Sequence, residues 1–202
     1  DNNGVVARQS GDKSFPQPPN GMLVYDFRQE DVIQFFIDKC VNMTKSKWID
    51  GCFVDRASEN LDSSQFNNYS FSDNDKTYFK NGHDYMLSKL TQTLIDNNQS
   101  IMISNNYVTP GVIATQIEDF YASEECIKLL MEYVNQGLLV EAHAGYQTDG
   151  IDNHCQNIIN SLSAFLIGAG EYSYYGCSQG WYIEPDWIIN HSEYHKPLGK
   201  PN

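Results

Sequence analysis

The sequence predicts an α/β protein of the (β/α)8 TIM-type barrel class, with about six of the eight strand–helix units in this chain of 202 residues. Segments with strand-like apolar runs alternate with segments of helical period, and the apolar runs are nearly continuous. Such a pattern is typical of a parallel sheet covered by helices. Polar residues capable of chemistry also follow nearly every strand, which favours a barrel over a doubly wound open sheet. Barrels collect function from many strand ends, whereas open sheets concentrate it at one switch point.

The predicted elements follow one another in a regular order along the chain. The head, residues 1–21, is polar and rich in Gly and Pro, which predicts a loop. Strands are predicted over residues 22–27, 48–55, 100–104, 111–120, 138–146 and 172–178. Helices are predicted over residues 29–43, 84–95, 123–137 and 157–170, where apolar residues recur with helical spacing. The third helix is marked at both ends, by a capping serine, Ser123, and by Gly137.

Length and composition indicate one domain over residues 1–202. With 41% hydrophobic residues, a chain of this size can fill one sizeable core. About six strands are too few to close an eight-stranded barrel. If the last predicted strand is the eighth, the first two units precede Asp1. The chain is then expected to be the C-terminal, larger part of a barrel. The expected partners, besides a ligand, are other chains that complete the barrel, or an extracellular assembly.

Charge and motif content exclude several classes of partner. The net charge of −13 argues against nucleic acid or an anionic membrane, because such surfaces are bound chiefly by Lys and Arg. No apolar run approaches the roughly 20 residues needed to span a bilayer. No glycine-rich phosphate loop follows a strand, so an intracellular α/β enzyme with a phosphorylated ligand is the weaker alternative. No cofactor is predicted, and without histidines at metal-ligand spacing no metal site is predicted either.

The cysteines and sequons favour a secreted, extracellular or lumenal protein. The cysteines are Cys40, Cys52, Cys126, Cys155 and Cys177. No CxxC pair occurs among them, which argues against a zinc ribbon or thioredoxin chemistry. In a secreted protein we expect one or two disulfides and a remaining odd cysteine, with Cys52 as a small core residue. Candidate N-glycosylation sites are Asn42, Asn68, Asn98 and Asn190.

The stretch WIDGCFVDRASEN, residues 48–60, delivers a carboxylate at the end of a predicted strand. Asp50 lies about 16 Å from Asp55 along an extended chain and on the opposite face, so the two cannot form one catalytic pair. Asp55 is the candidate at the strand's end, and Arg56 beside it would keep a carboxylate ionised. The alternative for Asp55 is capping of the following segment.

Further acidic residues lie near the ends of two later strands. Glu118 and Asp119 follow the TQI segment, two strands away from that of Asp55, so inward-leaning side chains could bring the carboxyls to about 5–9 Å. The alternatives are a surface ion pair for Glu118 and a helix cap for Asp119. Glu141 and His143 share one face of their strand. Because an unpaired buried Glu is costly, Glu141 is expected either to line a polar mouth or to be the second carboxylate.

Four short segments together resemble a known group of enzymes. They read VYDF at 24–27, DGCFVDRA at 50–57, IEDF at 117–120 and YHKPLGKP at 194–201. The pattern is similar to glycoside hydrolases of (β/α)8 fold related to endo-α-1,4-polygalactosaminidase and α-galactosidase. The resemblance covers roughly residues 20 to 200. It implies that Asp55 acts as nucleophile or base and Glu118 as general acid.

Two functions follow as expectations from this resemblance and from the residues. The first is a secreted glycoside hydrolase that cleaves O-glycosidic bonds with Asp55 and Glu118. Its substrate-binding residues would be Asp26, Arg28, Arg56, Asn105, Glu141, His143 and Tyr146. The second is a non-catalytic glycan-binding or extracellular structural protein built on the same barrel. In both cases the expected partner is a carbohydrate.

Overall fold

The computed structural model describes residues 25–46, 48–55, 57, 60–62, 71–98, 100–145, 155, 158–178 and 190–196. Its elements are α1 (Glu30–Thr44), β1 (Gly51–Val54), α2 (Asp73–Asn98), β2 (Ile101–Asn105), β3 (Ala114–Ile117), α3 (Glu124–Asn135), β4 (Leu139–Ala144), α4 (Ile159–Gly168), β5 (Ser173–Cys177) and the 3₁₀ helix η3 (Ser192–His195). The strands form a parallel sheet in the order β1-β2-β3-β4-β5. This confirms the α/β class, and closure into a barrel stays a prediction.

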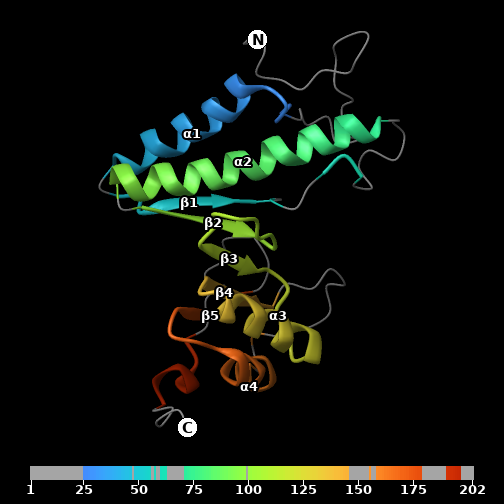
Figure 1. Cartoon of the computed structure of the whole chain (residues 1–202). Helices are drawn as coiled ribbons and strands as arrows, with labels where there is room; N and C mark the ends of the chain where they lie inside the picture. The colour runs from blue at the N-terminus through green and yellow to red at the C-terminus, as the bar shows by residue number, and fades with distance from the viewer. Residues whose placement is uncertain are drawn as a thin grey trace. The chain divides into compact units, whose positions relative to one another are not determined.

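The chain divides into two compact units, Asp1–Thr115 and Gln116–Asn202, with the boundary inside β3. The first unit contains α1, β1, α2 and β2. Its two strands pair in parallel with Gly51 opposite Ile101 and Val54 opposite Ser104. Helices α1 and α2 lie alongside one another next to β1 in Figure 1.

The core of the first unit lies between its helices and one face of its strands. The buried residues of this core are Ile33, Ile37, Cys40, Ala57, Met86, Leu87, Leu90, Leu94, Met102 and Val112. From the strands, Cys52 and Val54 pack against them. Because side chains alternate along a strand, Phe53 points to the other face, where 45% of it is exposed. The helices therefore cover only one face of β1 and β2 among the described residues.

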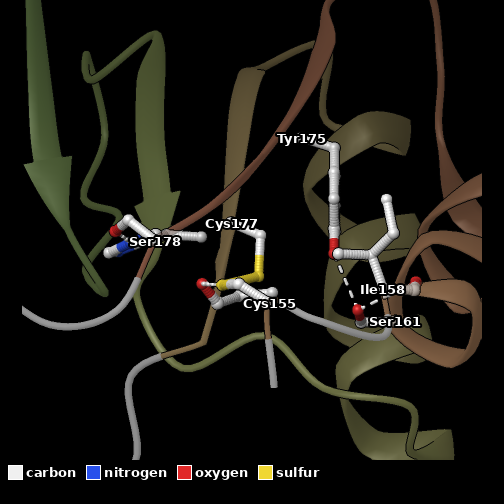
Figure 2. Close-up of a disulfide and its surroundings, with 8 residues drawn as sticks. Cys155, Ile158, Ser161, Tyr175, Cys177 and Ser178 are labelled. Atoms are coloured by element: carbon white, nitrogen blue, oxygen red, sulfur yellow. Dashed lines mark hydrogen bonds between the residues drawn. A yellow bond between two sulfur atoms is a disulfide. The ribbon is translucent and has the colours of Figure 1, made fainter. Parts of the chain in front are cut away.

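The second unit has a buried cluster of its own at the ends of β4 and β5, part of which Figure 2 shows. In β4 the alternate residues Val140, Ala142 and Ala144 are at most 2% exposed. Ala144 belongs to a cluster with Cys155, Ile158 and Cys177, against which Leu162 of α4 and Tyr175 of β5 pack. Strands β4 and β5 pair in parallel, so the residues that face away from this cluster alternate with those that join it.

Helix α3 begins where the sequence predicts. The Ser123 side chain accepts a hydrogen bond from the backbone N–H of Cys126 at 3.1 Å, which satisfies one donor of the first helical turn. Asp119 is therefore not the cap that was the alternative for it. Glu124 and Glu125 in the first turn complement the positive end of the helix dipole.

Strands β1 and β3 are shorter than predicted, and two other elements differ more. Helix α2 begins at Asp73 rather than at residue 84. Ser72 Oγ accepts a hydrogen bond from the backbone N–H of Asp75 at 3.1 Å, and this cap allows the helix to begin in the polar segment before residue 84. Residues 25–27 form no strand, and the rest of the strand predicted at 22–27 lies outside the described residues.

The interpretation of Cys52 as a simple core residue is wrong. Cys52 forms a disulfide with Cys40 that joins β1 to α1, since the two lie face to face across the helix–strand contact. A second disulfide joins Cys155 to Cys177, and Cys126 is a buried free thiol. The expectation of up to two disulfides with one odd cysteine is confirmed.

Candidate functional site

In the first unit, the site residues brought together are Asp55 and Asn105. Asp55 directly follows β1 and is exposed, whereas Asn105 ends β2 and is buried. The Asn105 amide Nδ2 donates to Asp55 Oδ1 at 2.9 Å. The parallel register, continued by one residue, places the two opposite one another on the face turned away from the helices. This hydrogen bond holds the Asp55 carboxylate in one orientation.

Asp26 and Arg28, predicted as substrate-binding residues, bind each other in the structure. The Arg28 guanidinium donates from Nε to Asp26 Oδ1 at 2.8 Å and from Nη2 to Asp26 Oδ2 at 2.9 Å. It also binds Asp75 near the start of α2. The hydrogen bond to Asp26, with the charges of both carboxylates, raises the pKa of Arg28 above its usual value. Asp26 is only 3% exposed, and its bidentate ion pair holds the Arg28 side chain in place. The contact of Arg28 with Asp75 then joins the segment before α1 to α2.

In the second unit, Gln116 and Glu141 form a hydrogen-bonded pair. Gln116 Nε2 of β3 donates to Glu141 Oε2 of β4. Glu141 is only half-buried, and a Cβ at Gly176 of β5 would lie 3.6 Å from Glu141 Oε1. The sequence analysis did not single out Gln116, and the role of Glu141 at a polar mouth or as the second carboxylate stays a prediction. The missed signal is that Gln116 lies in a fully buried strand, where an amide requires a partner.

His143 lies two residues after Glu141 on the same face of β4 and is 8% exposed. Its Nε2 is 2.6 Å from the hydroxyl Oγ of Ser178, which directly follows β5. Ser178 was also missed by the sequence analysis. Ser178 lies two residues after Gly176, which pairs with His143, and therefore on the same face as His143; only the strand register reveals this.

The acidic turn, defined here as Glu118 and Asp119, directly follows β3. The next residue, Phe120, donates its backbone N–H to the carbonyl of His143 at 2.9 Å, which fixes the turn against the end of β4. Partial burial of the carboxyl and repulsion from Glu118 raise the pKa of Asp119, and a positive charge on His143 would lower it. The turn therefore carries a carboxyl group that accepts a proton more readily than an ordinary Asp.

The remaining predicted residues lie elsewhere or outside the described part. Arg56, Tyr146 and Asn68 belong to residues that the structure does not describe, as does the side chain of Asn98. Asn42 is exposed on α1 beside Lys45, whose Nζ donates to its Oδ1 at 2.8 Å. Asn190 is exposed, with His195 Nε2 at 3.0 Å from its Oδ1.

The described residues contain neither a metal-binding cluster nor a membrane-spanning helix. No group of three or more His, Cys, Asp or Glu side chains there is arranged to hold a metal ion. None of the helices described has both the length and the apolar character that crossing a bilayer requires.

The chain matches the model of a known protein family. The model of a family described as hypothetical glycosyl hydrolase family 15 matches residues 2–202, which is nearly the whole chain. No curated protein matches the chain.

Proposed function

Because the chain belongs to the family described as hypothetical glycosyl hydrolase family 15, we propose that it hydrolyses O-glycosidic bonds with a pair of carboxyl groups. The match over residues 2–202 is the observation that carries this proposal. It supports a carbohydrate as the ligand. A relationship to the endo-α-1,4-polygalactosaminidase and α-galactosidase barrels is the finer part of the proposal, as is the closed (β/α)8 barrel.

In this proposal Asp55 acts as the nucleophile or as the base that activates water. An exposed carboxylate at a strand's carboxyl end is accessible to a sugar, and Asn105 holds one of its oxygens by a 2.9 Å hydrogen bond. Such a fixed orientation is what attack at an anomeric carbon or on a water molecule requires. The same role is implied by the DGCFVDRA segment.

Glu118 is the proposed general acid, which protonates the glycosidic oxygen. It directly follows β3, as Asp55 directly follows β1. A retaining mechanism needs carboxyl groups about 5–5.5 Å apart, and an inverting one about 6.5–9.5 Å. The proposal therefore requires the carboxyl groups of Asp55 and Glu118 to lie at one of these two separations when substrate is bound. Asn105, Glu141 and His143 would bind sugar hydroxyl groups.

The test replaces each proposed carboxylate in the full chain and measures release of reducing sugars from a panel of glycans. Asp55→Asn and Glu118→Gln are expected to lower turnover by about 10²–10⁴-fold. Asp50→Asn is the matched control, because Asp50 is exposed at the opposite end of the same strand. Wild-type turnover in Asp55→Asn would contradict the assignment. Glycan binding without any cleavage would support the non-catalytic function instead.

We also propose that the protein is secreted and carries N-linked glycans. The two disulfides are compatible with an oxidising compartment. Exposure of Asn42 and Asn190 makes both accessible to a glycan. Secretion from a eukaryotic host should give a mass that falls on enzymatic deglycosylation, and the fall should be smaller for Asn42→Gln. An unchanged mass would refute glycosylation.

A further inference from the structure

The end of β2 and the residues that follow it, 104–107 and here called the β2 turn, direct Asn105 toward Asp55. The Asn105 side chain is buried, and its Nδ2 lies 2.9 Å from Asp55 Oδ1. A side chain in such a position points where its backbone directs it, so its aim depends on how firmly the turn is held. The contacts that hold the β2 turn therefore also hold the Asp55 carboxylate.

Two hydroxyl groups hold the backbone of the β2 turn. The Ser104 hydroxyl donates to the backbone carbonyl of Tyr107, which closes the turn. The Thr115 hydroxyl, from β3, donates to the backbone carbonyl of Ser104 at 3.0 Å. Between Ser104 and Tyr107 the chain passes through Asn106, whose φ of 50° lies in the left-handed region that asparagine adopts more readily than most residues. Asn105 therefore lies between two anchored positions of a tight turn.

The side chain of Tyr107 attaches the β2 turn to helix α2. Its hydroxyl donates to Asp84 Oδ1 at 2.7 Å and accepts a hydrogen bond from Lys80 Nζ at 2.9 Å. Lys80 and Asp84, one helical turn apart, also form an ion pair with each other. A hydroxyl between a carboxylate and an ammonium group makes two charge-assisted hydrogen bonds, which are stronger than neutral ones. The Tyr107 hydroxyl is therefore a firm link between the turn and the helix.

The ring of Tyr107 is held by packing as well. Its centroid lies 6.1 Å from that of the buried His83 of α2. The Tyr107 side chain also packs against the buried core of the first unit. Because these contacts involve the ring, loss of the hydroxyl alone would remove the link to the α2 ion pair and leave the packing in place. The hydroxyl can thus be tested separately from the ring.

We propose that Tyr107 is a positioning residue, which fixes the β2 turn to α2 so that the Asn105 amide holds the Asp55 carboxylate in the orientation for attack. The contacts run from the α2 ion pair through the Tyr107 hydroxyl to the turn, and from Asn105 to Asp55. All of these residues belong to the first unit. The part of Asp55 in catalysis rests on the proposed function, whereas the link from Tyr107 to Asn105 is a property of the free protein.

The test follows the Asn105 amide and the Asp55 carboxyl group by NMR in the full chain without substrate. Tyr107→Phe removes the hydroxyl and keeps the ring. The Asn105 Nδ2 protons should exchange with solvent about 10-fold faster in this variant, because a hydrogen bond to a charged group contributes at least roughly that factor. The side-chain carboxyl ¹³C signal of Asp55 should shift in the same variant.

Tyr85→Phe is the matched control. Tyr85 lies on the same helix, is 48% exposed and has Lys89 Nζ 5.3 Å from its ring centroid. The control therefore deletes an equivalent hydroxyl beside a different lysine of α2. The exchange of the Asn105 amide and the Asp55 signal should keep their wild-type values.

Asn105→Ala tests the route of the effect by a double-variant cycle. If Tyr107 acts on Asp55 through Asn105, adding Tyr107→Phe to Asn105→Ala should not shift the Asp55 signal further. An effect of Tyr107 on the general structure would produce the same Asp55 shift with and without the Asn105 amide.

Wild-type exchange of the Asn105 amide in Tyr107→Phe would overturn the proposal, as would an equal Asp55 shift in the two backgrounds. These results are independent of whether glycans are cleaved. If cleavage is detected, Tyr107→Phe should lower kcat about 10-fold with little change in KM, and should have no further effect in Asn105→Ala. Wild-type cleavage together with a shifted Asp55 signal would contradict the catalytic role of Asp55 and not its positioning by Tyr107.

Discussion

Removal of the Cys155–Cys177 disulfide should destabilise the second unit strongly and locally. The perturbation is the double variant Cys155→Ala/Cys177→Ala. The two cysteines are separated by 22 residues. In the chain-entropy model, a loop of that length corresponds to about 3.4 kcal/mol of stabilisation, because the cross-link restricts the unfolded chain. This is roughly a 300-fold change in an opening equilibrium constant.

Native-state hydrogen exchange is the assay, because it resolves the effect by element. Amides of β4 and β5 should exchange about 300-fold faster in the double variant under conditions where exchange follows the opening equilibrium. The comparison variant is Cys40→Ala/Cys52→Ala, whose 12-residue separation predicts about 2.8 kcal/mol and an effect on α1 and β1. The free thiol of Cys126 is the same in both variants.

One outcome would refute this reasoning. If β4 and β5 keep their protection to within a few-fold, the disulfide does not restrict the unfolded chain as assumed. A thiol titration of the denatured, unreduced wild type gives a prior check, because two disulfides leave one reactive thiol among five cysteines. Five reactive thiols would show that the protein does not form these disulfides.

Three further predictions concern other packed groups. Burial lowers the pKa of His83 to about 4, below its unfolded value near 6.5. Up to roughly 3 kcal/mol of the free energy of unfolding is therefore present above pH 6.5 and lost as the pH falls through 4. His83→Phe should make the free energy of urea unfolding less dependent on pH between pH 7 and 4. Arg28→Lys should lower the free energy of unfolding, measured by thermal unfolding, by about 1–3 kcal/mol, because Lys cannot make the bidentate contact to Asp26. Lys89→Ala, which removes an exposed ion pair with Glu30, should lower it by under about 1 kcal/mol. Gly145→Ala should lower the melting temperature by several degrees, because Gly145 has a φ of +99° and a Cβ there would clash with Cys155 Sγ. An unchanged melting curve would contradict this close approach to the disulfide.

The sequence predicts most of the elements because their patterns are local. The helical spacing of apolar residues finds α1, α3 and α4 to within a few residues. Helix α2 extends 11 residues further toward the N-terminus than predicted, to Asp73 rather than Asp84. The first turns of α2 are polar, so the spacing of apolar residues does not reveal them. Ser72, which caps these turns, is polar as well. The disulfide between Cys40 and Cys52 also forms only if the face of β1 that carries Cys52 packs against α1. The spacing of residues along the sequence does not determine which face of β1 packs there.

The site is predicted less completely, because its contacts join distant segments. Strand alternation places Glu141 and His143 on one face, as the structure has them. Their partners Gln116 and Ser178 come from neighbouring strands, and finding them requires the strand order and register. Asp26 shows the reverse case, since a residue predicted to bind sugar is engaged with an arginine two positions away.

The exposed ring of Phe53 offers a test of the barrel. Parallel strands are usually covered on both faces, yet Phe53 is 45% exposed on the face of β1 that α1 and α2 leave open. If a closed barrel interior surrounds this ring in solution, Phe53→Ser should cost about 1.5–3 kcal/mol in urea unfolding. The control is Tyr78→Ser on α2, where a ring 63% exposed should cost under about 0.5 kcal/mol. Equal small losses in both variants would mean that solvent, rather than further strands, faces Phe53, and the barrel prediction would fail.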